Sequence, residues 1–285
     1  MAVIFDGKKF AHEKEKSLRR QFKLIVDKKK IAPKLVSILV GNNPTICLYT
    51  RLKKEAAERV GVNFEKVEFA EKAKDRQIKE YIKKLNKNPR VGGIMVQLPL
   101  PVSLKDKKGE IVETIVPTKD VDCLTPENLG LLMMGRPRVL PATVRGIWEI
   151  LGRARINEKT IVGKNVCVLG RSDIVGKPLA NLLINRGATV TVCHRRTKDL
   201  ACLIKRADII ISATGSPNLV KGEMVKEGVI VIDVGSPKGD IDFDSVIKKA
   251  SFITPVPGGV GPMTVISLLG NFLDLALLFL FFLIR

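Results

Sequence analysis

The chain has 285 residues, of which 45% are hydrophobic and 27% are charged, as expected for a globular protein with a sizeable core. Its 49 Lys and Arg outnumber 29 Asp and Glu, and the net charge of +20 favours acidic ligands such as phosphates, polycarboxylates or nucleic acid. Only two Tyr and one Trp could stack on bases, which argues against a dedicated nucleic-acid function.

Cysteine and histidine usage narrows the chemistry further. The five cysteines are unclustered, which indicates free thiols rather than a disulfide framework or a zinc site. With only two histidines, a metal site and a histidine-based triad are both disfavoured. The four-residue apolar run before Asp6 is too short for a signal peptide, so we expect a cytoplasmic protein without a bound metal.

The first half of the chain alternates strands with helices. We expect strands at residues 35–40, 67–70 and 91–96, and helices at residues 45–60, 75–85 and 111–116. Gly61 is a natural C-cap for the first of these helices. This alternation predicts a parallel α/β sheet.

The second half predicts another α/β unit. A helix at residues 141–151 leads to strands at 165–169, 188–193, 207–213 and 229–234, with a helix at 177–186. A strand, a glycine turn, a helix and a second strand form half of a dinucleotide-binding fold. The predicted architecture is therefore α/β with two lobes and a cleft between them.

Residues 263–284 are almost entirely apolar and are long enough to span a bilayer. Asp274 near the centre opposes insertion, as do Asn271, Gly270 and Ser267. Hydropathy alone does not decide between a membrane span and a buried C-terminal helix. We favour the buried helix.

The sequence GRSDIVGKP at residues 170–178 lies where a dinucleotide fingerprint is expected, although it is not G-x-G-x-x-G. A pyrophosphate at the following helix N-terminus would meet free N–H groups and the positive end of the helix dipole. The candidate cofactor-binding residues here are Gly170, Arg171, Ser172, Val175 and Gly176. A turn without any ligand is the alternative.

The residues that follow the next predicted strand help to distinguish NAD from NADP as the cofactor. NAD sites usually place a carboxylate there for the ribose hydroxyls, but this chain has His194 and Arg195. An arginine would pair with a 2′-phosphate, which favours NADP. The alternative is a pair of exposed basic residues on an already basic protein.

Tyr49 and Lys53 are four residues apart and therefore share one face of the predicted helix. Short-chain dehydrogenases use the same Y-x-x-x-K spacing, but their nucleotide fingerprint precedes the pair, whereas here it follows by about 120 residues. Spacing alone therefore favours a solvated lysine over a catalytic one.

Gln97 and Asp122 are two further candidates. Gln97 follows a buried strand, and ligands bind at the carboxyl ends of strands in open α/β sheets. Asp122 lies in the polar segment KDVD, which a solvated acidic turn would explain equally well.

Several stretches of the chain are distinctive when taken together: VGNNP, YTRLKKEAAERVGV, GGIMVQLPLP, PTKDVDCLTPENLG, GKNVCVLGRSDIVGKPLANLL, ATVTVCHRRT, KEGVIVIDVG and TPVPGGVGPMTV. They resemble the bifunctional methylenetetrahydrofolate dehydrogenase/methenyltetrahydrofolate cyclohydrolase family. They occur in family order over nearly the whole chain, and the longest are highly specific.

The resemblance implies a fold and a set of roles. Residues 1–140 with a returning helix at 265–285 would form a catalytic, folate-binding domain, and residues 141–264 a Rossmann-like NADP domain. Lys53 would be the main catalytic residue, positioned by Gln97, with Tyr49 flanking the folate and Asp122 bonding its pterin edge. The other implied folate contacts are Leu98, Pro99, Pro257, Gly258 and Gly259, and Ser236 would lie near the nicotinamide.

The implied reaction oxidises methylenetetrahydrofolate with NADP and hydrolyses the methenyl product to formyltetrahydrofolate, without a metal. Many members of the family have Ser where this chain has Ile46, which removes a polar side chain near the implied active site. The resemblance therefore implies dehydrogenase activity more strongly than efficient cyclohydrolase activity. A monofunctional dehydrogenase is the nearest alternative. A basic membrane-associated or nucleic-acid-associated protein that retains the fold is the alternative from another class. A homodimer is expected.

Overall fold

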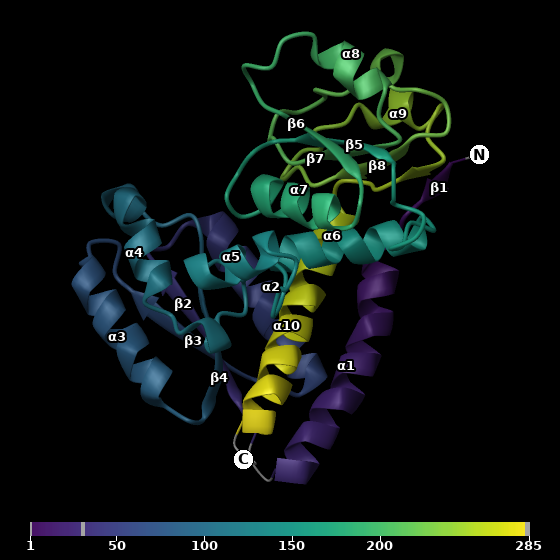
Figure 1. The fold of residues 1–285 in the computed structure, drawn as a ribbon. Coiled ribbons are helices and arrows are strands. Elements are labelled where there is room, and N and C mark those ends of the chain that lie inside the picture. The colour runs from purple at the N-terminus through teal and green to yellow at the C-terminus, as the bar shows by residue number, and fades with distance from the viewer. Residues whose placement is uncertain (1, 30–31, 283–285) are drawn as a thin grey trace. The chain divides into compact units, whose positions relative to one another are not determined.

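The computed structural model describes residues 2–29 and 32–282, which form two compact units (Figure 1). Unit 1 contains the described residues of Met1–Ala11, Leu132–Arg136 and Thr143–Thr264. Unit 2 contains those of His12–Leu131, Pro137–Ala142 and Val265–Arg285. This division by compactness differs from the functional domains predicted above, whose boundaries remain a prediction.

Unit 2 is built on a parallel three-stranded sheet in the order β3-β2-β4. The strands are β2 (Lys34–Val40), β3 (Asn63–Phe69) and β4 (Val91–Val96), connected by α2 (Pro44–Val60) and α3 (Asp75–Lys87). The prediction of β4 is confirmed, and β2 starts one residue earlier than predicted. β3 starts four residues earlier, because its charged residues occupy the exposed positions of an edge strand.

The two faces of this sheet carry different partners. Val36, Ile38 and Val40 pack in one core cluster with α3 and α4 (Lys108–Glu113). Side chains alternate along a strand, so Leu35, Ser37 and Leu39 lie on the opposite face. That face therefore has a buried serine in its centre.

Local capping explains where the helices of this unit begin and end. The Asn43 side chain accepts hydrogen bonds from the first N–H groups of α2, and Gly61, with φ 90°, ends the helix. α4 ends at Glu113, whereas the prediction extended to residue 116. Val116 is extended because it precedes Pro117, and the residue before proline disfavours the helical region.

Four helices in the described part of the chain were not predicted: α1 (Gly7–Lys29), α5 (Pro126–Met133), α8 (Leu200–Lys205) and α9 (Phe243–Val246). α1 buries Ala11, Leu18, Phe22 and Ile25, and is otherwise rich in basic residues. From His12 onward it runs beside α10, where the rings of Phe22 and Phe272 lie 6.2 Å apart (Figure 1). Short 3-10 turns occur at Val102–Lys107, Pro117–Lys119 and Gly222–Met224.

Unit 1 is built on a six-stranded parallel sheet in the order β1-β9-β8-β7-β5-β6. Its strands are β1 (Val3–Ile4), β5 (Asn165–Leu169), β6 (Thr189–Cys193), β7 (Ile209–Ser212), β8 (Ile230–Asp233) and β9 (Phe252–Ile253). Its helices are α6 (Ala142–Arg153), α7 (Gly176–Asn185), α8 (Leu200–Lys205) and α9 (Phe243–Val246). The strand order reverses direction between β5 and β7, which is where doubly wound sheets bind ligands.

The apolar C-terminal segment forms α10 (Val260–Phe282). Val260–Leu278 is long and apolar enough to cross a membrane, but 72% of that stretch is buried inside the protein. The buried-helix alternative therefore describes α10. The last three residues of the predicted helix, 283–285, lie outside the described residues.

The close packing at β4 leads to a stability prediction. A Cβ on Gly93 would lie 2.5 Å from Val121 Cγ1 and 2.8 Å from the Phe272 ring, so Gly93→Ala forces buried groups apart. We expect a loss of about 1–3 kcal/mol in the free energy of unfolding, measured by urea titration.

The matched control is Gly130→Ala on α5, where the added methyl group would meet nothing within 4 Å. That change should leave the urea midpoint unchanged or raise it slightly, because alanine favours helix. Equal midpoints for the two variants would contradict the close packing at β4.

Candidate active site

A chain of hydrogen bonds joins α2 to the sheet of unit 2. Lys53 Nζ donates to Gln97 Oε1 at 3.0 Å, and Gln97 Nε2 donates to Ser37 Oγ at 2.9 Å. Gln97 and Ser37 are buried, and Lys53 is half-buried. The bond to Ser37 orients the Gln97 amide so that its oxygen faces the lysine. Lys53 is therefore hydrogen-bonded within unit 2 rather than fully solvated.

The environment of Lys53 shifts two ionisable groups in opposite directions. Burial lowers the pKa of Lys53, and the negative charge of Asp122 partly opposes this. Burial raises the pKa of Asp122, against the effect of Lys53, and the charge of Asp120 raises it further. Burial thus disfavours the charged form of both groups, while each charge partly stabilises the other.

The other candidate site residues of unit 2 are Tyr49, Leu98 and Pro99, each close in sequence to Lys53 or to Gln97. Tyr49 is half-buried one turn before Lys53 on α2. Leu98 is partly buried and Pro99 exposed, directly after Gln97, and the Leu98–Pro99 peptide bond is cis. Ile46 is buried and its carbonyl accepts a hydrogen bond from Thr50 Oγ1, so the first turn of α2 carries an apolar side chain at this position.

Lys119, which the sequence did not single out, anchors the segment that leads to Asp122. Its side chain is buried, and burial lowers its pKa. Its ammonium donates to three carbonyl oxygens at the end of α3, those of Leu85, Asn86 and Asn88, at 2.7–3.1 Å. Cations stabilise the C-terminal end of a helix, so Lys119 joins this segment to α3.

Asp120 is a second residue that the sequence analysis missed. Its Oδ2 accepts from the backbone N–H groups of Leu124 and Thr125, from Thr125 Oγ1 and from Asn128 Nδ2, at 2.8–3.1 Å. Burial raises the pKa of Asp120, and these donors oppose that change. The segment is therefore not a fully solvated turn, since Asp120 is only 1% exposed and Asp122 is half-buried.

In unit 1 the fingerprint loop requires glycine at two positions where the backbone packs closely. A Cβ on Gly176 would collide with the Gly170 carbonyl oxygen, and a Cβ on Gly170 would collide with the Ala213 carbonyl oxygen. Gly170 also has φ 108°, which favours glycine. Ser172 Oγ accepts from the N–H groups of Val175 and Gly176 at the start of α7. Arg171 is exposed beside them.

The remaining cofactor candidates follow β6 and β8. His194 is half-buried, and its N–H donates to Thr197 Oγ1 at 2.9 Å, which closes the turn after β6. Arg195 is exposed and makes no ion pair with the described residues. Ser236 is exposed just beyond β8.

Three predicted folate contacts belong to unit 1 rather than to the unit that contains Lys53. Pro257 and Gly258 line a cavity of about 340 Å³ together with residues 4–6, Lys8 and Pro255. Gly259 approaches backbone closely, since a Cβ there would lie 2.6 Å from the Pro255 carbonyl oxygen.

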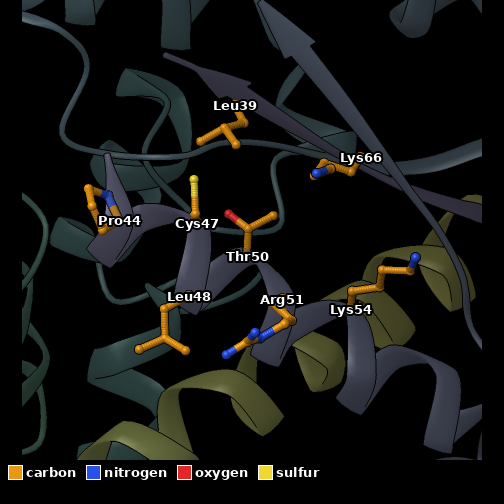
Figure 2. A pocket seen from close by; sticks show the side chains of 8 residues that line it. All are labelled: Leu39, Pro44, Cys47, Leu48, Thr50, Arg51, Lys54 and Lys66. Carbon is orange, nitrogen blue, oxygen red and sulfur yellow. The ribbon is translucent and has the colours of Figure 1, made fainter. Parts of the chain in front are cut away.

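A larger hollow, of about 430 Å³, lies against α2 but contains none of the candidate residues (Figure 2). Its three cations are Arg51, Lys54 and Lys66. Each has a carboxylate partner, Glu55, Glu58 and Glu68 respectively, at 2.7–3.8 Å. The hollow therefore offers little uncompensated charge to a ligand.

Comparison with known proteins decides the family. Residues 5–122 match the tetrahydrofolate dehydrogenase/cyclohydrolase catalytic domain, and residues 141–278 match the NAD(P)-binding domain of the same family. The chain belongs to the tetrahydrofolate dehydrogenase/cyclohydrolase family. The resemblance and the α/β fold class predicted from the sequence are thereby confirmed.

Individual relatives cover almost the whole chain. The bifunctional protein FolD of Nitratiruptor sp. is 46% identical over 94% of this chain and 95% of its own length. The crystal structure of the bifunctional FolD enzyme from Campylobacter jejuni is 41% identical with a TM-score of 0.90, over 97% and 99% of the two chains. The Trypanosoma brucei FolD structure, complexed with NADP and an inhibitor, is 38% identical with a TM-score of 0.93, over 98% of both chains.

The charge of Asp122 leads to a pKa prediction in this family member. In protein labelled with ¹³C-lysine, the Cε signal of Lys53 should titrate below the ordinary lysine value of 10.5. Asp122→Asn removes the charge that raises the pKa of Lys53, so the midpoint should move lower still.

Glu55→Gln is the control, because Glu55 lies on the same helix and pairs with Arg51. It should leave the Lys53 midpoint unchanged. A Lys53 midpoint of 10.5 or above in the wild type would overturn the prediction.

Proposed function

We propose that this protein oxidises methylenetetrahydrofolate to methenyltetrahydrofolate with NADP and hydrolyses the product to formyltetrahydrofolate. The observation that carries the proposal is the hydrogen-bonded series Lys53–Gln97–Ser37 beside Asp122. It lies within the part of the chain that matches the family's catalytic domain.

Lys53 would act in the hydrolytic step. A lysine whose pKa is lowered by burial has a larger neutral fraction near neutral pH than a solvated lysine. Its neutral amine can take the proton that water loses on attacking the methenyl carbon. The same group can return a proton to the ring nitrogen as the carbon–nitrogen bond breaks. Gln97 holds the amine in place without adding a charge.

Asp122 and Tyr49 would hold the folate. A carboxyl group whose pKa is raised by burial can carry a proton and donate to a ring nitrogen or oxygen of the pterin. Tyr49, on the same face of α2 as Lys53, would pack against the folate rings. Leu98, Pro99, Pro257, Gly258 and Gly259 are proposed as further substrate contacts.

The residues of the fingerprint loop fit NADP. The glycines at 170 and 176 leave space that any Cβ would fill, and the positive end of the α7 dipole begins there. When bound, NADP accepts the hydride from the methylene carbon. Arg195 is proposed to bind the 2′-phosphate, with Arg171, Val175 and His194 along the cofactor and Ser236 near the nicotinamide.

Ile46 favours one second candidate, a monofunctional dehydrogenase. Ile46 is buried on α2, one turn before Thr50, and supplies no polar side chain to the site. Hydride transfer needs only the placement of folate and NADP, whereas hydrolysis also needs proton transfers. An apolar side chain at this position would therefore lower the rate of hydrolysis more than the rate of hydride transfer.

Cytoplasmic location and a homodimer remain part of the proposal. The homodimer is supported by the outer strand β6, on which Val192 is exposed, since unpaired strand edges commonly associate. Sedimentation velocity would test it, and a monomer at micromolar concentration would argue against it.

Lys53→Met should abolish hydrolysis more strongly than hydride transfer. We expect the decay of methenyl absorbance to slow by on the order of 10²–10⁴-fold, because general acid–base catalysis is lost. A coupled assay with methylenetetrahydrofolate and NADP follows the rise and the decay of this absorbance in one trace.

The control for Lys53 is Lys54→Met, which changes a neighbouring exposed lysine whose partner is Glu58 at 3.7 Å. It should behave as the wild type. Equal losses of hydride transfer and hydrolysis in Lys53→Met would favour the monofunctional alternative. No methenyl rise in the wild type with either NADP or NAD would rule out the proposed function.

Arg195→Ser tests the cofactor assignment. Losing a charged hydrogen bond to the 2′-phosphate should raise the KM for NADP by about 10- to 100-fold and leave the KM for NAD unchanged. Arg196→Ser removes the adjacent exposed arginine and should have a much smaller effect. A larger effect from Arg196→Ser would move the assignment to that residue.

A further inference from the structure

The backbone next to Asp122 is held by one side chain of α10. Asn271 is fully buried, and its Nδ2 donates to the Val121 carbonyl oxygen at 2.8 Å and to the Leu140 carbonyl oxygen at 2.7 Å. The surrounding turns of α10 bury apolar side chains, namely Leu268, Leu269, Phe272, Leu273 and Leu275. Burying an amide among apolar side chains costs free energy unless its polar atoms are hydrogen-bonded. The bonds to these two carbonyl oxygens therefore hold the Asn271 amide in place.

Consecutive residues of α10 contact the segments that carry both partners of Lys53. Asn271 bonds to Val121, the residue before Asp122. Phe272 packs against Gly93 in β4, the strand that leads into Gln97. α10 therefore packs against the strand that precedes Gln97 and against the residue that precedes Asp122.

Other hydrogen bonds hold the Asp122 segment on both sides of Asp122, and the Val121 N–H donates to the Ile94 carbonyl oxygen at 3.5 Å. Lys119 bonds to the end of α3, and Asp120 bonds to groups from Leu124 to Asn128. Cys123, in a left-handed conformation with φ 56°, donates its thiol hydrogen bond to the Val139 carbonyl oxygen. None of these bonds involves the Val121 carbonyl oxygen, which accepts its hydrogen bond from Asn271. The charged groups that act on Asp122 are Lys53 and Asp120.

We propose that Asn271 is a positioning residue that acts through the Val121 backbone to fix the position of Asp122 relative to Lys53. The inference rests on the proposed function of Lys53 and Asp122, but it concerns a residue that touches neither substrate nor cofactor. Holding a carboxyl group within its working geometry matters because a displacement of about 1 Å can reduce a rate on the order of 100-fold.

The test uses Asn271→Leu, which keeps a similar volume and removes both donors. We expect kcat/KM for methenyl hydrolysis to fall on the order of 100-fold and the KM for folate to rise. If Asp122 moves away, Lys53 loses the charge that raises its pKa, so the ¹³C titration of Lys53 should move to lower pH. The KM for NADP should not change, because the proposed cofactor residues lie in unit 1.

Leu275→Ala is the matched control, since Leu275 is buried one turn further along α10 and bonds to no carbonyl through its side chain. It should lower the thermal midpoint without changing the Lys53 titration or the KM for folate. If Asn271→Leu is unfolded by circular dichroism, Asn271→Ser replaces it. Serine retains one donor and should give a smaller shift in the same direction.

Two results would overturn the proposal: a wild-type Lys53 titration and folate KM in a folded Asn271 variant, or the same shifts in Leu275→Ala. Failure of the wild type to form methenyltetrahydrofolate would count against the proposed function instead. The Lys53 titration needs no turnover, so it still decides the role of Asn271 in that case.

Discussion

The polar centre of unit 2 is built around one half-buried lysine amine that is hydrogen-bonded to a neutral amide. Lys53 meets a neutral amide oxygen from Gln97, and Gln97 is fixed in turn by Ser37 in the middle of the sheet. A carboxylate in the place of Gln97 would pair with the ammonium and raise the pKa of Lys53. The amide accepts the hydrogen bond without that charge, so burial remains the dominant influence on the lysine.

Much of the fold was predictable because hydrophobic periodicity is a local property. The strands β4 and β5 and the C-cap at Gly61 follow directly from apolar runs and turn residues. The two-residue strands β1 and β9 were missed, since so short a strand is defined only by its pairing partner. α1 was missed although Ala11, Leu18, Phe22 and Ile25 recur at helical spacing, because the basic residues between them dominate its composition.

The site was less predictable, because burial of a polar residue arises from tertiary packing. Spacing placed Tyr49 and Lys53 on one face of α2, but nothing local distinguishes Lys53 from its exposed neighbour Lys54. The family resemblance was needed to favour Lys53. Ser37 and Asn271 did leave a signal, since each is an isolated polar residue within an apolar run. Lys119 and Asp120 left none, because their partners come from α3 and from Asn128.

Buried polar side chains in unit 2 gather around the segment that carries Asp122. Ser37, Gln97, Asp120 and Asn128 are all nearly inaccessible, and each is hydrogen-bonded. Such a network costs desolvation energy and contributes to stability only if every member is satisfied. The apolar burial of α10 offsets that cost, and the same helix supplies Asn271 to one of the carbonyls beside Asp122. This accounts for why so apolar a helix retains a buried amide: the packing that stabilises unit 2 also fixes the geometry of its polar centre.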